Sequence, residues 1–183
     1  MQKQVYIVHG FAAHPKKHWF SWLQSELEKD GASVKVLEMP NSSNPNLNEW
    51  FKTLRTQVKS GANTYFVGHS LGCISILRYL ESENEQIGGV VLVSGFYESL
   101  KILPQLDSFT KNVLNFEKLI QKVPKRVVIT ARNDEIVPTS LSVNLAAKLK
   151  ATLIQTELGG HFMQEEGIKT MPCALMSLKQ MWQ

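Results

Sequence analysis

The chain carries a serine between two glycines in the pattern Gly-x-Ser-x-Gly, formed by Gly68, Ser70 and Gly72. In the segment TYFVGHSLGCISILRYL, residues 64–80, the residues before the pattern are typical of a strand and those after it of a helix. A sharp turn of this kind strains the serine backbone, lifts the hydroxyl above a sheet and leaves no room for side chains at the glycines. The pattern predicts a nucleophile at Ser70, the alternative being a turn whose small residues serve packing alone.

A serine hydroxyl is a weak nucleophile, so it needs an imidazole base and a carboxylate that orients this base. Asp134 follows the apolar run RVVITA, and His161 follows the run TLIQTE and the pair Gly159-Gly160. We expect the two glycines to let the histidine loop approach the serine closely. The order along the chain, serine then aspartate then histidine, is that of α/β-hydrolases.

Other acids compete with Asp134 for the orienting role. Glu135 is its neighbour and could replace it, although we favour Asp134. Asp30 ends a predicted helix, and Asp107 lies in an irregular segment, so neither is expected to reach the site.

Three other histidines lie close to the predicted site. His69 occupies the turn beside Ser70, where we expect its side chain to point away from the site. His14 and His18 follow the first strand and are candidates to border the pocket, but loop histidines are more often simply exposed.

Acyl transfer also needs donors for the oxyanion of the tetrahedral intermediate. One is expected from the backbone N–H of Leu71, the residue after the nucleophile, and the other from the loop after the first strand. That loop reads VHGF at residues 8–11, where Gly10 permits a close approach of the backbone. The amide of Phe11 is therefore the predicted second donor.

The elements that must position these residues alternate between strand and helix from end to end. Six apolar runs predict strands at residues 5–8, 34–37, 65–67, 90–93, 127–130 and 153–156. Helical patterns separate most of them, and the irregular stretch 98–124 is expected to hold one or two short helices. The alternation predicts an α/β fold with a mostly parallel sheet in the order 2-1-3-4-5-6 and helices on both faces. Strands one and three are then neighbours, and ligands bind where their carboxyl ends meet.

Composition excludes several classes of protein. The 183 residues are 43% hydrophobic and 20% charged, which is typical of one globular domain spanning 1–183. The formal charge of +4 comes from scattered basic residues, without the clustered patch of a nucleic-acid-binding protein. Cys73 and Cys173 lack metal-ligand spacing, and no apolar stretch reaches the ~20 residues of a membrane helix. The first apolar run is too short for a signal peptide, so a reduced, cytoplasmic setting is expected.

Several motifs together are similar to those of one known family. The segments VYIVHGF, HWFSWL, EMPN, VGHSLGC, LVSGF, ARNDEIVP and GGHF resemble the small serine hydrolases related to retinoblastoma-binding protein 9, including the bacterial YdeN-like members. The resemblance covers nearly the whole chain and implies a compact α/β-hydrolase fold with a minimal lid. It places Ser70, Asp134 and His161 at the family's catalytic positions. The L-x-C-x-E motif of the vertebrate member is not matched, because residues 71–75 read LGCIS, so retinoblastoma-protein binding is not expected.

These observations predict a serine hydrolase that cleaves carboxylic esters and needs no metal and no organic cofactor. Short acyl groups are expected, because the stretch 98–124 offers little surface to enclose a long chain. Candidate pocket residues are Phe11, Phe96, Leu100 and Phe162. The expected partner is a small-molecule ester, with no nucleic acid and no membrane, and the protein is expected to be a monomer or a small homo-oligomer. Amidase, thioesterase or lyase chemistry and a non-catalytic interaction module on the same scaffold are the alternatives.

Overall fold

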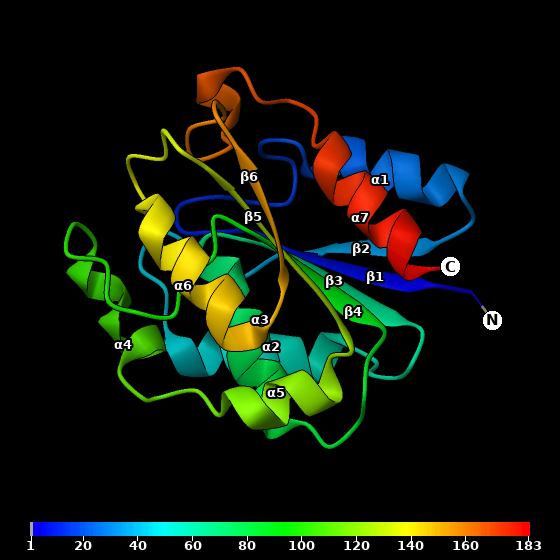
Figure 1. Ribbon diagram of the computed structural model, residues 1–183. Coiled ribbons are helices and arrows are strands. Elements are labelled where there is room, and N and C mark those ends of the chain that lie inside the picture. Colours follow the sequence, from blue (N-terminus) through cyan, green and yellow to red (C-terminus); the bar gives the residue numbers. More distant parts are fainter. Residues whose placement is uncertain (1) are drawn as a thin grey trace.

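The computed structural model describes residues 2–183 and contains a six-stranded parallel sheet (Figure 1). The strands are β1 (Gln4–Val8), β2 (Ser33–Leu37), β3 (Thr64–His69), β4 (Gly89–Val93), β5 (Lys125–Ala131) and β6 (Thr152–Thr156). Their order across the sheet is β2-β1-β3-β4-β5-β6, and every neighbouring pair is parallel. The strand order predicted from the sequence is therefore confirmed.

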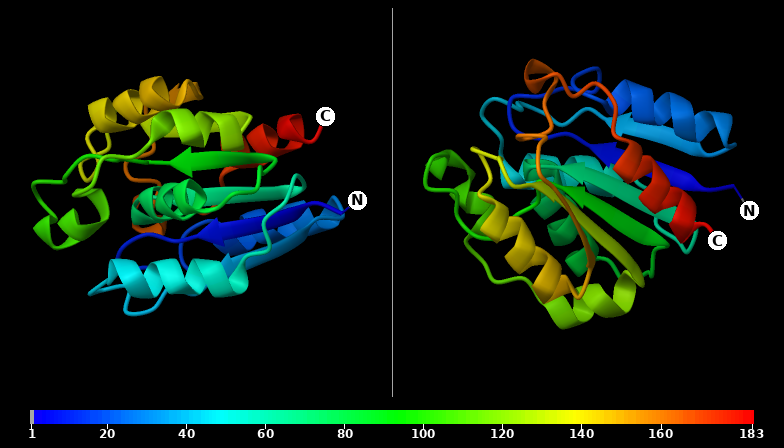
Figure 2. Two further views of the ribbon diagram at one scale, coloured as in Figure 1. Left: turned by 90° about the horizontal axis from the view of Figure 1, so that it is seen from below. Right: turned by 45° about the horizontal axis from the view of Figure 1, so that its top comes forward.

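Helices cover both faces of the sheet (Figures 1 and 2). On one face lie α1 (Phe20–Lys29) and α7 (Pro172–Met181). On the other lie α2 (Leu47–Gln57), α3 (Leu71–Ser82), α5 (Phe116–Lys122) and α6 (Thr139–Leu149). Each face has its own hydrophobic core, and every residue of the central strands β3 and β4 is buried. This double burial explains why these strands are continuous apolar runs and show no alternation.

The segment between β4 and β5 is the least regular part of the described residues. It holds a 3₁₀ turn (Pro104–Leu106), the short helix α4 (Asp107–Thr110) and then α5. The expectation of one or two short helices here is confirmed. Residues 99–102 of this segment lie beside the start of α6.

The carboxyl ends of the strands meet at one edge, because all six strands run in the same direction. The loops that leave this edge after β1, β3, β5 and β6 carry, in that order, Phe11, Ser70, Asp134 and His161. The topology therefore brings together residues that are up to 150 positions apart in the sequence.

Candidate active site

Ser70 sits in the sharp turn between β3 and α3 with a strained backbone. Its φ is 53° and its ψ is −119°, a combination that non-glycine residues rarely adopt. Such strain costs of order 1–3 kcal/mol and persists only where the surrounding structure enforces it. The Ser70 N–H donates to the carbonyl oxygen of Val93 at 2.9 Å, and the amide of Cys73 donates to the Ser70 carbonyl at 2.9 Å. The turn is therefore held from β4 and from the first turn of α3.

The glycines on either side of the serine are required for steric reasons. A Cβ atom on Gly68 would lie 2.9 Å from the backbone nitrogen of Cys73 in α3. A Cβ atom on Gly72 would lie 2.2 Å from the carbonyl oxygen of Val8 in β1. The prediction that neither glycine has room for a side chain is confirmed, because one would collide with α3 and the other with β1.

Replacing Gly72 with alanine is expected to lower the free energy of unfolding by about 2–3 kcal/mol, because backbone atoms of β1 cannot move aside cheaply. Urea unfolding followed by circular dichroism measures this effect. The matched control is Gly61→Ala, whose new Cβ would meet no atom within 4 Å. We expect the control to stay within about 0.5 kcal/mol of the wild type; equal losses in both variants would contradict the steric explanation.

The carboxylate of Asp134 is fully buried, and both of its oxygens accept hydrogen bonds. Oδ1 accepts the backbone N–H groups of Ile136 and Val137, each at 2.9 Å. Oδ2 accepts the hydroxyl of Ser94 at 2.7 Å. The His161 Nδ1 lies 3.1 Å from Oδ1 and 2.9 Å from Oδ2. The neighbouring Glu135 is exposed, so the structure supports the choice of Asp134 as the partner of the histidine.

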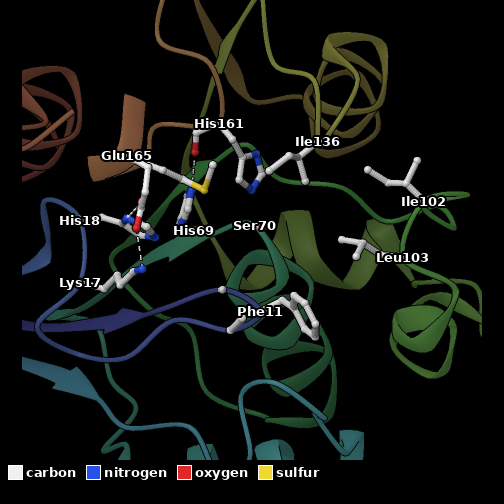
Figure 3. Close-up of a pocket in the computed structure, with 13 residues that line it drawn as sticks. Phe11, Lys17, His18, His69, Ser70, Ile102, Leu103, Ile136, His161 and Glu165 are labelled. Carbon is white, nitrogen blue, oxygen red and sulfur yellow. Dashed lines mark hydrogen bonds and ion pairs between the residues drawn. The ribbon is translucent and has the colours of Figure 1, made fainter. Parts of the chain in front are cut away.

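The contact with Asp134 determines how His161 can act. A carboxylate only accepts hydrogen bonds, so Nδ1 of His161 carries the proton and Nε2 is left with a free lone pair. His161 and Ser70 border the same pocket (Figure 3). Within residues 2–183 no hydrogen bond joins the Ser70 hydroxyl to this imidazole. Bonds between catalytic groups are often long before substrate binds and shorten in the complex.

Glu166 organises the loop that carries His161. Its carboxylate accepts the backbone N–H groups of His161 and Met163, each at 2.9 Å. A Cβ atom on Gly160 would lie 1.9 Å from this carboxylate, and one on Gly159 would lie 2.7 Å from the ring of Phe162. The two glycines therefore make room for contacts inside the loop itself. The expectation that they serve a close approach to the serine is corrected accordingly.

His69 lies inside the site, and the expectation that it points away was wrong. Its Nε2 donates to the carbonyl oxygen of His161 at 2.8 Å, and the two ring centroids are 4.9 Å apart. Burial is the main reason why the pKa of His69 is well below its usual range, and the nearby His161 and His18 lower it further. His69 is therefore a neutral donor that supports the loop of His161.

His18 and its neighbours join the loop after β1 to the loop after β6. The His18 N–H donates to the side-chain oxygen of Gln164 at 3.0 Å, and the Gln164 N–H donates to His18 Nδ1 at 3.1 Å. Lys17 pairs with Glu165 at 2.6 Å, and the indole N–H of Trp19 donates to the carbonyl of Phe162 at 3.1 Å. We call this set of contacts the loop clamp. His18 borders the pocket, whereas His14 is exposed.

The stability of the protein is expected to fall as the pH drops from about 6.5 to 4. Burial lowers the pKa of His18 from 6.5 to about 4, despite the opposing effect of Glu165. Between these pH values the unfolded chain binds a proton that the folded chain excludes, so protonation favours unfolding. Protonation of His18 is expected to lower the free energy of unfolding by on the order of 2–3 kcal/mol between pH 6.5 and pH 4.

Urea unfolding at pH 7.5 and at pH 4.5 measures this dependence. His18→Asn keeps an acceptor near the position of Nδ1, and asparagine tolerates the positive φ of 53° found here. On acidification, the free energy of unfolding of this variant is expected to fall by about 2 kcal/mol less than that of the wild type. The exposed His14→Asn serves as the control and should behave as the wild type does. An unchanged pH dependence in His18→Asn would contradict the assignment.

Two backbone amides are free to stabilise an oxyanion beside Ser70. A Cβ atom on Gly10 would lie 3.0 Å from the Ser70 Cβ, so the loop after β1 packs directly on the serine. Leu71 opens α3, where the first amides have no partner within the helix. Within residues 2–183 the amides of Phe11 and Leu71 donate no hydrogen bond. This arrangement supports the predicted pair of donors.

The pocket above Ser70 has a volume of about 380 Å³ and two different ends (Figure 3). Lys17, His18 and Glu165 border one end, and Ile102, Leu103 and Ile136 border the other. Ser70 lies between the two groups in Figure 3. The pocket can therefore receive a molecule with one polar arm and one apolar arm.

The four residues predicted to line the pocket lie in different places in the structure. Phe11 borders the pocket. Phe96 is fully buried in the core on the α3 face, and Phe162 is buried in the core on the α1 face. Both loops turn back on the sheet, so their aromatic rings fill the cores and do not line the pocket. Leu100 lines a separate neighbouring cavity.

Ser94 and Glu166 make contacts within the candidate site that were not predicted from the sequence. Ser94 follows the apolar run of β4 directly and could have been noticed as a polar residue at the edge where the site forms. Glu166 gave no such signal, because its role depends on the path of its own loop. Among residues 2–183 no group of three or more metal-ligating side chains could hold a metal ion, and no helix is long and apolar enough to span a bilayer.

Comparison with known proteins places the chain in a family. The family described as serine hydrolase matches residues 5–180. The chain belongs to this serine hydrolase family. This serine hydrolase is 45% identical to YdeN of Bacillus subtilis (strain 168) over 175 residues, which are 94% of this chain and 92% of YdeN. The resemblance stated from the sequence motifs is therefore confirmed.

Solved structures agree with this assignment. The crystal structure of the ydeN gene product from B. subtilis matches this serine hydrolase with a TM-score of 0.97 and 42% identity, and 99% of each chain is covered. The serine hydrolase RBBP9 of Rattus norvegicus is a more distant relative, 25% identical over 150 residues that are 81% of this chain and 80% of RBBP9. Est1E from Butyrivibrio proteoclasticus shares the fold, with a TM-score of 0.76 at 15% identity over 99% of this chain and 88% of its own. The fold is therefore that of the α/β-hydrolases.

Proposed function

We propose that this serine hydrolase cleaves carboxylic esters through an acyl-enzyme on Ser70, with His161 as the base and Asp134 as the residue that orients the base. The observation that carries the proposal is the buried contact of 2.9 Å between His161 and Asp134, at a pocket that Ser70 also borders. A binding module would gain nothing from a strained serine, a histidine of fixed tautomer and a buried carboxylate together.

The proposed reaction follows from the protonation states of these groups. As Ser70 Oγ attacks the carbonyl carbon, Nε2 of His161 takes its proton, and Asp134 stabilises the imidazolium that forms. The tetrahedral intermediate collapses when the bond to the leaving oxygen breaks, and the alcohol departs with the proton from His161. Water then gives a proton to His161 and attacks the acyl carbon. The bond from this carbon to Ser70 Oγ breaks as Oγ takes the proton back from His161, which releases the acid and restores Ser70.

The amides of Phe11 and Leu71 are the proposed donors to the oxyanion. They come from the loop after β1 and from the first residue of α3, where the positive end of the helix dipole also favours negative charge. Each such donor is worth roughly 10²–10³-fold in kcat in enzymes where one has been removed. The proposed steps use only these groups and water.

Reaction with a fluorophosphonate probe tests the proposal. We expect one probe molecule per chain, located by mass spectrometry on the peptide that contains Ser70, and no labelling of Ser70→Ala. Hydrolysis of aryl esters, amides and thioesters by the unlabelled protein then shows which bond is preferred, and esters are expected to react fastest. An unlabelled wild type that also leaves every ester intact would overturn the proposal and favour a non-catalytic binding role.

A further inference from the structure

A second cavity adjoins the apolar end of the active-site pocket. It has a volume of about 370 Å³ and lies between residues 99–102 and the start of α6. Ile102 and Ile136 border both this cavity and the pocket that contains Ser70. The two spaces are therefore neighbours that share these two isoleucine side chains, which we call the ridge.

The walls of the second cavity suit an apolar group. Leu100 and Leu141 line it together with Pro138 and the two isoleucines, and Leu100 is only 3% exposed. Its polar residues, such as Glu135 and Ser140, are exposed and lie at its rim. The charged Lys17–Glu165 pair borders the opposite end of the first pocket (Figure 3). A substrate held at Ser70 would thus have one apolar direction in which to extend.

The ridge residue Ile102 is unusual because its large apolar side chain is 62% exposed. It belongs to the irregular segment before α4, and its neighbour Leu103 also borders the first pocket. The exposed side chain of Ile102 would lose its contact with water when an apolar part of a substrate lies across it. This burial would favour binding of such a substrate.

We propose that the second cavity binds the far end of an extended apolar arm of the ester, an aliphatic or aryl group of about six to ten carbons. The arm would run from Ser70 past Ile102 and Ile136 to Leu141. This inference rests on the proposed ester hydrolysis, and where the arm is the acyl group it replaces the short acyl group expected from the sequence. Each cavity alone has the size of a typical small-molecule site, ~300–1,000 Å³.

Chain-length profiles of two ester series test the proposal. One series varies the acyl group of p-nitrophenyl esters from two to ten carbons, and the other varies the alcohol of acetate esters over the same range. In one of the two series, kcat/KM is expected to rise at least ~10-fold from four to eight carbons, because each methylene that leaves water contributes up to about fourfold. The series that rises identifies the arm.

Two variants probe the path of the arm. Ile102→Asp places a charge on the ridge, and Ser140→Trp fills the second cavity from its exposed rim. In each, the ratio of kcat/KM for the eight-carbon ester to that for the two-carbon ester is expected to fall at least ~10-fold. This ratio cancels any loss of folded protein. Val113→Asp is the matched control, because Val113 is 91% exposed in the same segment but borders neither cavity.

The outcomes separate this inference from the proposed function. Failure of the probe and of every ester overturns ester hydrolysis itself. Hydrolysis of the two-carbon ester with no gain at eight carbons in either series overturns the second-cavity proposal alone. A gain that Ile102→Asp and Ser140→Trp leave intact, or that Val113→Asp also removes, overturns it too.

Discussion

Ester hydrolysis by Ser70→Ala is expected to proceed with a kcat at least ~10³-fold below that of the wild type. The substitution removes the nucleophile and leaves the pocket, the amides of Phe11 and Leu71 and the His161–Asp134 pair in place. These remaining groups account for the residual rate that such variants retain over water. Steady-state kinetics with a p-nitrophenyl ester measure the loss.

A matched control separates the loss of chemistry from the loss of structure. Ser177 is another buried serine, and its hydroxyl donates to the carbonyl oxygen of Cys173 in α7, at 2.7 Å and away from the site. Ser177→Ala should keep kcat within about twofold, and both variants should unfold cooperatively in urea. His161→Ala should be impaired nearly as much as Ser70→Ala, and the double variant little more, because the two groups act as a unit. A Ser70→Ala protein with a tenth of the wild-type rate would contradict the nucleophile assignment.

Asp134→Asn is expected to lower kcat by roughly 10³–10⁴-fold. Two backbone N–H groups, from Ile136 and Val137, donate to Oδ1 of Asp134 and will hold the amide oxygen of asparagine in that place. The NH₂ group must then face His161 Nδ1, where Oδ2 lies now. An NH₂ group only donates, so Nδ1 loses its proton and Nε2 carries it toward Ser70. In that tautomer the imidazole cannot accept the proton of the serine.

Glu135→Gln is the control for this variant, because Glu135 is exposed and adjoins Asp134 in the sequence. Its kcat should stay within about twofold of the wild type. The pair of variants decides between the two acids that the sequence left open. Full activity in Asp134→Asn together with a loss in Glu135→Gln would show that the wrong carboxylate had been chosen.

The fold could be predicted because its central strands are buried on both sides. A run such as residues 90–93 has no polar position, and only a parallel sheet covered by helices accommodates a series of such runs. The strand order then places the loops after β1 and β3 side by side. Ser70, Asp134 and His161 could be proposed as a group because each lies in the turn or loop that follows a strand, at the edge of the sheet where the topology brings these loops together.

The orientation of side chains within the loops could not be predicted in the same way. The ring of His69 turns toward the loop of His161 because a carbonyl oxygen 92 residues away accepts its N–H. The glycines at 159 and 160 serve contacts with Phe162 and Glu166 that exist only once the loop has folded. Phe96 and Phe162 read equally well as pocket or core residues, because apolar character does not say which side of a loop faces the sheet.

The loop clamp has a consequence for how such enzymes can diversify. Because Lys17, His18 and Trp19 hold the loop of His161, insertions on either side of the loop clamp are expected to disturb the proton transfer proposed for His161. Residues 97–115 contribute to the walls of the cavities. They belong neither to the loop clamp nor to the proposed group of Ser70, Asp134 and His161. This stretch is therefore the part of the chain in which mutation can alter substrate choice during evolution while the chemical apparatus is inherited unchanged.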